Sequence, residues 1–390
     1  MSTEATLDFW TRQGLRCECK GVCIGILRKV YGEYRVEEFG EQGYCSFTLL
    51  ATPLGMMHHH VVEDDVDREY GGYLGREKKE FVVQLRPARY SLDLEIARAA
   101  CATYPLLAPK IRYLDLDLPG ELCAYEIQRL NGTPFSRLQP HRRTLDSGTC
   151  QKLERLVTSF AEVIAQSWPA SSKDATTSRH IRADSPMDHS PDMLSQCPGK
   201  VGSSITDRLR KLAAELPDAQ LRDRAQSISR AVRGMTDYPV VLNHGDLIPS
   251  NILVDEKTWE IIGLVDWAEA EVLPFGTCLY GLEHLLGYME TSNSDGSSGC
   301  DAPLIFLYFD NAANLRNLFW THLLECTPEL RSRKDDVEVM RDMGVLLWRG
   351  IAWDDGAIDR VANEMDDAEE LAHLRAFLNA SQEFSGLDSS

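Results

Sequence analysis

The sequence predicts a two-lobed α+β protein, with a strand-rich N-terminal lobe over residues 1–130 and a larger, mostly helical C-terminal lobe over residues 131–390. Short segments rich in β-branched and aromatic residues occupy the first part of the chain, whereas segments with a 3.6-residue apolar period occupy the second. A length of 390 residues also exceeds what one compact core usually holds, so it fits two lobes of ordinary size. A short link near residues 128–134 joins them.

The first lobe is predicted from short apolar runs of the kind that form strands. These runs cover residues 22–27, 34–39, 45–51, 81–86 and 122–128. Gly40 and Gly43 lie between the second and third runs and predict a hairpin turn. Residues 92–104 have a helical pattern, and residues 55–79 form a polar excursion between two strands.

The second lobe is predicted from helical periodicity. Residues 153–164 and 205–216 repeat apolar side chains every three to four positions, and several amphipathic helices follow over residues 279–378. Residues 240–266 interrupt this pattern with short strands. Residues 169–203 are rich in Ser, Asp and Pro and poor in large apolar groups, so we expect a flexible insertion there.

Composition narrows the class of partner. The formal net charge of −19 disfavours nucleic acids and anionic membranes, and it favours a cationic small molecule, although solubility alone also explains it. No apolar run reaches the roughly 18 residues that a membrane span needs, and the N-terminal residues show no secretory signal. The 11 cysteines are odd in number and scattered, unlike a secreted disulfide scaffold. We therefore expect a cytoplasmic protein.

Residues 240–266 carry the clearest chemical pattern. A predicted strand leads into a His-Gly-Asp sequence that ends on Asp246, and Asn251 follows five positions later, directly before a second strand. A third apolar strand ends on Asp266. A lone Asp and Asn at this spacing would indicate only a capped turn, but the flanking strands and the second acid argue for a site.

Phosphoryl transfer explains this grouping. Its transition state spreads negative charge over oxygens, so the protein mainly positions the reactants and binds metal ions. Asp246 would align or deprotonate the attacking group, while Asn251 and Asp266 would hold Mg²⁺ through the hard oxygen ligands that this ion prefers. His244 is expected to brace the loop by hydrogen bonding rather than to act as a base.

The sequence His244-Gly-Asp-Leu-Ile-Pro-Ser-Asn251, followed by Val265-Asp266-Trp267, resembles the aminoglycoside phosphotransferase family, which is similar to choline kinases and more distantly to protein kinases. The resemblance implies a bilobal protein-kinase-like fold that binds ATP or GTP between a nucleotide-binding N-terminal lobe and a catalytic, acceptor-binding C-terminal lobe. It also implies that the catalytic Asp is Asp246 and that the metal ligands are Asn251 and Asp266. It spans roughly residues 20–350, and only residues 240–276 are highly specific.

The resemblance implies a phosphate-covering loop in the first lobe. The segment from Gly40 through Gly43 to Ser46 has the expected place in the chain, and its backbone amides would contact the nucleotide phosphates. A plain hairpin turn is the alternative for these two glycines.

The family also places a phosphate-binding Lys on the strand after the excursion, and this chain departs from that pattern. The strand reads Val83-Gln-Leu-Arg86, so Arg86 or Gln84 would have to serve, and Arg does not reproduce the geometry of Lys. Glu95 on the next helix resembles the acid that pairs with this cation. An exposed helix residue is the alternative, and Asp93 competes for the role.

The acceptor is expected to be a small molecule, because no activation segment of the protein-kinase type follows Asp266. Glu269 and Glu271 are candidate acceptor-binding residues whose carboxylates would suit amino groups, as is the Trp353-Asp354-Asp355 cluster; solvated surface positions are the alternative. The sequence thus predicts a small-molecule kinase that transfers the γ-phosphoryl group of ATP or GTP to a hydroxyl or amine. The rival is a kinase-like pseudoenzyme that only binds a nucleotide or ligand.

Overall fold

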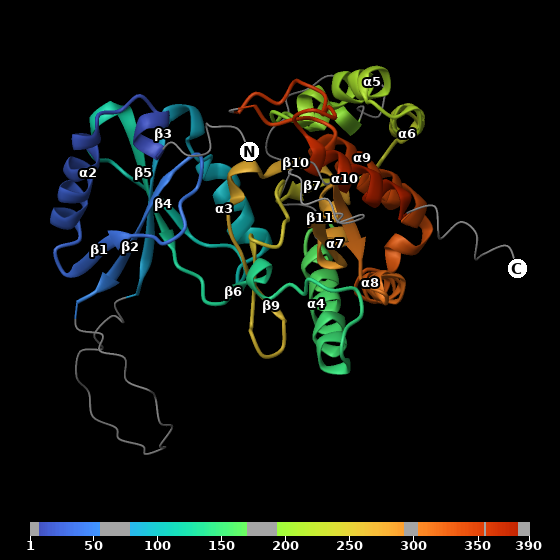
Figure 1. The fold of residues 1–390 in the computed structure, drawn as a ribbon, viewed down its shortest axis with the longest axis horizontal. Coiled ribbons are helices and arrows are strands. Elements are labelled where there is room, and N and C mark those ends of the chain that lie inside the picture. The colour runs from blue at the N-terminus through green and yellow to red at the C-terminus, as the bar shows by residue number, and fades with distance from the viewer. Residues whose placement is uncertain (1–7, 55–78, 170–192, 292–302, 355, 381–390) are drawn as a thin grey trace, which may run out of the picture. The chain divides into compact units, whose positions relative to one another are not determined.

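A computed structural model describes residues 8–54, 79–169, 193–291, 303–354 and 356–380 of the chain. The chain divides into two compact units. Unit 1 comprises residues 1–101 and 109–130, and unit 2 comprises residues 102–108 and 131–390 (Figure 1). The polar excursion expected at 55–79 lies almost wholly outside the described residues. The predicted α+β class is confirmed, since unit 1 is dominated by a sheet and unit 2 by helices.

Unit 1 is built on a five-stranded antiparallel sheet with the strand order β1-β2-β3-β5-β4 (Figure 1). Its strands are β1 (Tyr34–Glu38), β2 (Phe47–Pro53), β3 (Phe81–Pro87), β4 (Ile111–Leu114) and β5 (Leu122–Gln128). Its helices are α1 (Phe9–Arg12), α2 (Cys17–Val30) and α3 (Leu94–Thr103), the last of which runs on into unit 2.

The side chains of this sheet alternate between two different faces, as the two-residue period of a strand requires. On β2 and β3, Leu49 and Val83 belong to the core that α1 and α2 cover. Thr48 and Gln84, which pair across the same two strands, therefore lie on the opposite face. Arg86, two positions after Gln84, lies on that face too, so the sheet separates an apolar side from a side that carries polar groups.

The strand predicted at residues 22–27 is wrong, because these residues belong to helix α2. Cys23 and Leu27, four positions apart, are fully buried against the sheet, whereas Val22 is 51% exposed. A short run of apolar, β-branched residues is ambiguous between a strand and a buried helix turn, and here packing against the sheet decides in favour of the helix.

In the residues that the structure describes, unit 2 combines helices with three small antiparallel sheets. Its helices are α4 (Ser147–Ala165), α5 (Ile205–Glu215), α6 (Ala219–Gly234), α7 (Tyr280–Leu285), α8 (Ala312–Cys326), α9 (Lys334–Arg349) and α10 (Ala368–Asn379). Its strands are β6 (Thr133–Pro134), β7 (Val240–Asn243), β8 (Ile252–Val254), β9 (Ile261–Leu264), β10 (Glu271–Pro274), β11 (Gly287–Thr291) and β12 (Leu304–Tyr308). The hairpin of β11 and β12 was not predicted, since only helices were expected there.

The helical period predicted over residues 153–164 is confirmed in α4. Its apolar stripe is buried, and Phe160 meets Phe319 of α8 with a ring-centroid separation of 5.9 Å. The two helices lie side by side (green and orange in Figure 1). None of the helices in the described ranges is both long and apolar enough to cross a membrane.

The insertion expected at residues 169–203 is only partly described. Residues 170–192 lie outside the described ranges. For residues 193–203 the expectation of a loose segment is wrong, because Met193, Cys197 and Val201 are buried. The three apolar side chains are few, but they are spaced so that all of them pack, and composition alone does not reveal this.

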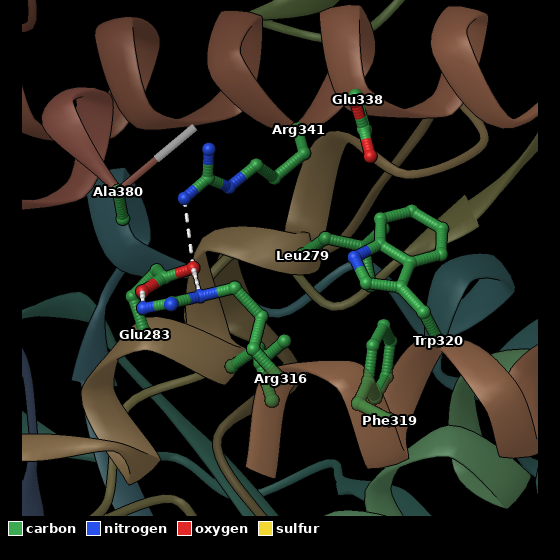
Figure 2. Close-up of a pocket in the computed structure, with 9 residues that line it drawn as sticks. Leu279, Glu283, Arg316, Phe319, Trp320, Glu338, Arg341 and Ala380 are labelled. Carbon is green, nitrogen blue, oxygen red and sulfur yellow. Dashed lines mark hydrogen bonds and ion pairs between the residues drawn. The ribbon is translucent and has the colours of Figure 1, made fainter. Parts of the chain in front are cut away.

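A buried ionic cluster joins the helices of unit 2. Glu283 of α7 accepts hydrogen bonds from Arg316 of α8 and Arg341 of α9, each at 2.7 Å (Figure 2). It also accepts a hydrogen bond from the Tyr308 hydroxyl at 2.8 Å. Burial raises the pKa of Glu283, but the charges of Arg341 and Arg316 outweigh it and lower the pKa to about 2. The adjoining cavity of about 30 Å³ has room for about one water molecule, so this cluster is structural.

Candidate active site

The His-Gly-Asp loop begins where β7 ends, and its first residue braces it. The ring of His244 donates through Nε2 to the carbonyl of Val265 at 3.0 Å and accepts through Nδ1 from the amide of Asp246 at 3.3 Å. Burial lowers the pKa of His244 to about 4, so the ring is neutral at pH 7 and has one donor and one acceptor nitrogen. The predicted bracing role of His244 is confirmed.

Gly245 is required by both backbone conformation and space. Its φ of 79° lies in the left-handed region, which costs a residue with a side chain roughly 1–2 kcal/mol. A Cβ atom at this position would lie 2.0 Å from the carbonyl oxygen of Glu269. The glycine therefore lets the loop pass directly against the backbone of Glu269.

Asn251 is locked to Asp246. Its amide Nδ2 donates to the carbonyl oxygen of Asp246 at 2.9 Å and to the carboxylate Oδ2 at 2.8 Å. Both protons of the amide are thereby used, and Asn251 is 8% exposed. Its Oδ1 has no hydrogen-bond partner within the described ranges, so the carbonyl end of this amide remains open to a ligand.

The carboxylate of Asp246 lies among other negative charges. Its pKa is raised from 3.8 to about 6, first by burial and then by the charge of Asp266, with a smaller contribution from Glu269. The charge of Arg349 and the hydrogen bond from Asn251 act in the opposite direction. The acids of this segment are therefore close enough to repel one another, and a bound cation would relieve that repulsion.

Asp266 follows β9 and adopts a left-handed conformation, with φ 62° and ψ 67°. Such backbone conformations are uncommon for a residue other than glycine, although Asp adopts them more readily than most, and they are enriched at functional sites. The next residue anchors the turn, because the Trp267 indole is buried, donates to the carbonyl of Leu264 at 2.9 Å and lies 4.4 Å from the His244 ring. The Asp266 side chain is exposed.

The donor set of this turn fits Mg²⁺. The open Oδ1 of Asn251 and the Asp266 carboxylate, which accepts no hydrogen bond from any described residue, are both hard oxygen ligands. Two protein ligands are enough for this ion, since it keeps several waters. The repulsion between Asp246 and Asp266 is a further reason to expect a cation here.

The two expected acceptor-binding glutamates differ in their surroundings. Glu269 is exposed, and its charge acts on Asp246. Glu271 accepts hydrogen bonds from the backbone amides of Val201 and Gly202 at 2.9–3.1 Å. The Glu271 carboxylate therefore anchors the segment that precedes α5, a role that sequence reasoning did not anticipate.

In unit 1 the loop with Gly40, Gly43 and Ser46 joins β1 to β2. Neither glycine has a positive φ, and the Ser46 hydroxyl is buried 3.3 Å from the Thr48 hydroxyl. A side chain that the sequence did not single out closes the loop. Gln42 donates to the carbonyl of Thr48 at 2.9 Å and accepts from the amide of Thr48 at 2.8 Å. The loop is therefore held by a side-chain bridge rather than by glycine conformations.

Arg86 is 5% exposed, and its guanidinium donates to the Gln84 side chain at 3.2 Å. Its Nε is buried and has no partner, and no carboxylate pairs with it within the described residues. The expected pairing with Glu95 is not present, because Glu95 is exposed and pairs with Arg98 on its own helix. Arg86 thus presents a positive charge without a counter-charge on the polar face of the sheet.

Comparison with protein families decides what kind of protein carries this site. Residues 72–276, more than half of the chain, match the model of the phosphotransferase enzyme family. The chain belongs to this family. The resemblance and the kinase-like fold predicted from residues 240–276 are thereby confirmed, and the protein is an enzyme of the phosphotransferase class. None of the curated proteins matched its sequence.

Solved structures of phosphotransferases resemble the chain at low identity. A mutant of aminoglycoside 2′-phosphotransferase-IIIa in complex with GDP is 12% identical, with 93% of this chain and 96% of that chain covered and a TM-score of 0.47. The macrolide 2′-phosphotransferase MphH from Brachybacterium faecium is 17% identical, with 93% and 97% covered and a TM-score of 0.41. A thermostable mutant of APH(4)-Ia with AMP-PNP and hygromycin B is 13% identical, with 92% and 98% covered and a TM-score of 0.49.

The phosphotransferase contains one more charged residue at this site that sequence reasoning missed. Arg349 ends α9, about one hundred positions after the His-Gly-Asp loop, and its charge acts on Asp246. No motif surrounds Arg349 in the sequence, and an amphipathic helix that ends on a basic residue is common. Only the packing of α9 in unit 2 brings this charge to the acidic loop.

Proposed function

We propose that this phosphotransferase is a small-molecule kinase, which transfers the γ-phosphoryl group of ATP or GTP to a hydroxyl or amine of a small, cationic acceptor. The observation that carries the proposal is the locked pair of Asp246 and Asn251. The Asn251 amide donates both of its protons to Asp246 and leaves its Oδ1 without a partner among the described residues. A merely structural turn would not require a second acid, Asp266, whose charge acts on this pair.

Asp246 acts as the base of the proposed reaction. As the acceptor oxygen or nitrogen attacks phosphorus, its proton passes to the Asp246 carboxylate, a bond to phosphorus forms and the bond to the nucleoside diphosphate breaks. A pKa raised to about 6 by burial and by Asp266 suits this role, because the group is ionised at pH 7 and still basic enough to take a proton. The hydrogen bond from Asn251 holds Oδ2, which leaves the other oxygen for the acceptor.

Asn251 and Asp266 are the proposed metal ligands, and Mg²⁺ bound to them would neutralise the charge of the nucleotide phosphates. Asn251 and Asp266 contribute by holding their oxygen donors in place. Trp267 fixes the turn that carries Asp266, and the hydrogen bonds to Asp246 fix Asn251. The two oxygen donors are therefore positioned before any ligand binds, and this lowers the entropic cost of binding.

In unit 1 we propose that Arg86 binds the nucleotide phosphates in place of the usual Lys. A buried guanidinium without a carboxylate is costly, and an anionic ligand would supply the missing charge. The loop through Gly40, Gly43 and Ser46 would cover the phosphates. Glu95 would have to leave Arg98 in order to pair with Arg86.

On the acceptor side, the exposed Glu269 is the proposed contact for an amino group, whereas Glu271 contributes indirectly through the segment that it anchors. A small acceptor is supported by the short path after Asp266, where the chain turns within a few residues into β10. A nucleotide-binding pseudoenzyme is the second candidate, and the absence of the usual Lys from β3 favours it.

The experiment that tests the proposal measures binding before turnover. Thermal unfolding is followed with Mg-ATP and Mg-GTP, each with and without EDTA, and a ligand at 100 times its dissociation constant should stabilise by about 2.7 kcal/mol. Asp266→Ala should abolish the Mg-dependent shift while the protein still folds. Asp255→Ala is the matched control, because Asp255 only caps the turn at Lys257 and Thr258 in the neighbouring hairpin.

Acceptor-dependent turnover then separates the two candidates. Amino sugars, amino alcohols and nucleosides are screened for nucleoside diphosphate release in the presence of Mg²⁺. Turnover with any of them supports the kinase. A Mg-dependent thermal shift with neither transfer to an acceptor nor slow hydrolysis of the nucleotide would favour the pseudoenzyme. The absence of any nucleotide-dependent thermal shift would contradict both candidates.

A further inference from the structure

Arg349 is set apart from the other arginines around it by its partner. It lies at the end of α9, is partly buried, and donates through one terminal nitrogen to Nε2 of His284 at 2.7 Å. Arg316 and Arg341, which lie on α8 and α9, are both ion-paired with Glu283. Arg349 forms no ion pair with any residue in the described ranges, and its Nε is buried without a partner.

His284 holds Arg349 as a neutral acceptor. The ring is 5% exposed and packs against His373 at 4.8 Å and against Phe377 of α10 at 4.8 Å. Burial and the charge of Arg349 both lower the pKa of His284, so the ring carries a lone pair rather than a second positive charge. A neutral imidazole orients the guanidinium without cancelling its charge, as a carboxylate would.

The end of α9 is tied to the loop of Asp246 through α7. Trp348 stacks on Tyr280 with ring centroids 5.5 Å apart, and the Tyr280 hydroxyl accepts a long hydrogen bond of 3.4 Å from the amide of Leu247. Gly281 fits closely here, since a Cβ atom would lie 2.8 Å from the Cβ of Leu247. These contacts run through residues adjacent in sequence to Arg349 and to Asp246, so they bring the end of α9 close to the loop that carries Asp246.

The charge balance explains what Arg349 is for. Asp246, Asp266 and Glu269 bring three carboxylates together. Arg349 acts on Asp246 with the opposite sign. Burying a guanidinium without a carboxylate partner is costly unless its charge is used elsewhere. In this part of unit 2, the positive charge of Arg349 can offset the negative charges of Asp246, Asp266 and Glu269.

We infer that Arg349 is a positioning residue for phosphoryl transfer, which supplies a positive charge that offsets the acids around Asp246 and is itself set in place by His284. The inference rests on the proposed function, because it concerns the same base. It assigns to α9 and α7 a role in the rate of transfer that is separate from nucleotide binding, since neither helix carries a proposed nucleotide or metal ligand.

The test compares Arg349→Ala, Arg349→Lys and His284→Phe with the parent enzyme. The readout is hydrolysis of Mg-ATP or Mg-GTP, or transfer to an acceptor found in the screen, together with the KM for the nucleotide. Arg349→Ala should lower kcat by about 10- to 100-fold, the usual effect of losing a residue that orients a reacting group, with an unchanged nucleotide KM. Arg349→Lys should restore part of kcat, and His284→Phe should give an intermediate loss.

Added guanidinium tests whether the charge of Arg349 acts directly on the rate, because a purely structural defect would not respond to it. At millimolar concentration it should raise kcat of Arg349→Ala and leave the parent unchanged. The matched control is Arg331→Ala, because Arg331 is an exposed arginine just before α9. A parent enzyme without Mg-dependent turnover would overturn the proposed function itself. If the parent is active, two results would overturn the inference alone. In one, Arg349→Ala keeps the parental kcat; in the other, Arg349→Ala loses kcat and neither added guanidinium nor Arg349→Lys restores it.

Discussion

Asp246→Asn should remove most of the activity and at the same time stabilise the protein in EDTA. General-base catalysis typically contributes 10²–10⁴-fold, so kcat should fall by about that factor. Nucleotide affinity should remain nearly normal, because Asn251 and Asp266 are unchanged. An Asn side chain is nearly isosteric and can still accept the hydrogen bond from the Asn251 amide, so the loop should keep its conformation.

The gain in stability follows from the raised pKa. Burial and the charge of Asp266 raise the pKa of Asp246 from 3.8 to about 6, so the folded state binds this proton more tightly than the unfolded state. Stability is therefore lost as the pH rises from about 4 through 6. At about 1.4 kcal/mol per pKa unit, ionised Asp246 costs the metal-free protein about 3 kcal/mol above pH 7. Asn cannot ionise and escapes this cost.

The assay is urea unfolding in EDTA at pH 8 and pH 5, combined with turnover in Mg²⁺ at pH 8. Asp246→Asn should be more stable than the parent by up to about 3 kcal/mol at pH 8 and by roughly half as much at pH 5. Asp255→Asn is the control. The pKa of Asp255 is lowered by hydrogen bonds from Thr258, so no gain in stability is expected there, and its turnover should be parental.

Two outcomes would refute this reasoning. If Asp246→Asn turns over a true acceptor at the parental rate, the base lies elsewhere and the assignment of the His-Gly-Asp loop is wrong. If Asp246→Asn instead loses kcat but is no more stable than the parent at pH 8 in EDTA, neither burial nor the charge of Asp266 raises the pKa of Asp246 in the folded protein. The electrostatic argument for a cation between Asp246 and Asp266 would then fail.

Three further predictions concern the framework of the site. Gly245→Ala should destabilise unit 2 by at least roughly 1–2 kcal/mol, because alanine must adopt a left-handed backbone and its Cβ would lie 2.0 Å from the Glu269 carbonyl oxygen. The melting temperature should fall measurably, and an unchanged melting temperature would contradict the loop geometry. Burial lowers the pKa of His244 from 6.5 to about 4, so the stability that the neutral ring contributes is complete above about pH 6.5 and is lost as the pH falls toward 4. His244→Gln should therefore reduce the pH dependence of the free energy of urea unfolding by up to about 3 kcal/mol between pH 6.5 and 4. Parallel pH curves for the two proteins would argue against a neutral buried ring. Glu283→Ala should lower the free energy of unfolding by about 3–5 kcal/mol, because it leaves Arg316 and Arg341 buried without their shared carboxylate. The control Glu290→Ala removes an exposed carboxylate and should change the free energy of unfolding little. Equal effects of the two variants would mean that the cluster contributes nothing to stability.

The sequence by itself determined the elements whose signal is local. The apolar stripe of α4 and the strands on either side of the His-Gly-Asp loop follow from short-range periodicity. The grouping of Asp246, Asn251 and Asp266 is also local in origin. They lie within about twenty positions, in the short connections from β7 to β8 and from β9 to β10, and such short connections leave the side chains few other places to lie. The bracing by His244 follows from the same closeness.

Only the tertiary structure decided the features that depend on distant residues. Residues 22–27 are helical because Cys23 and Leu27 pack on a sheet formed later in the chain. Glu271 is occupied by the amides of Val201 and Gly202, about seventy positions earlier, and Arg349 reaches the site from about one hundred positions away. These outcomes depend on which surfaces meet when helices pack. Helix packing depends on the summed shape and charge of both partners, and no local pattern in the sequence encodes that sum.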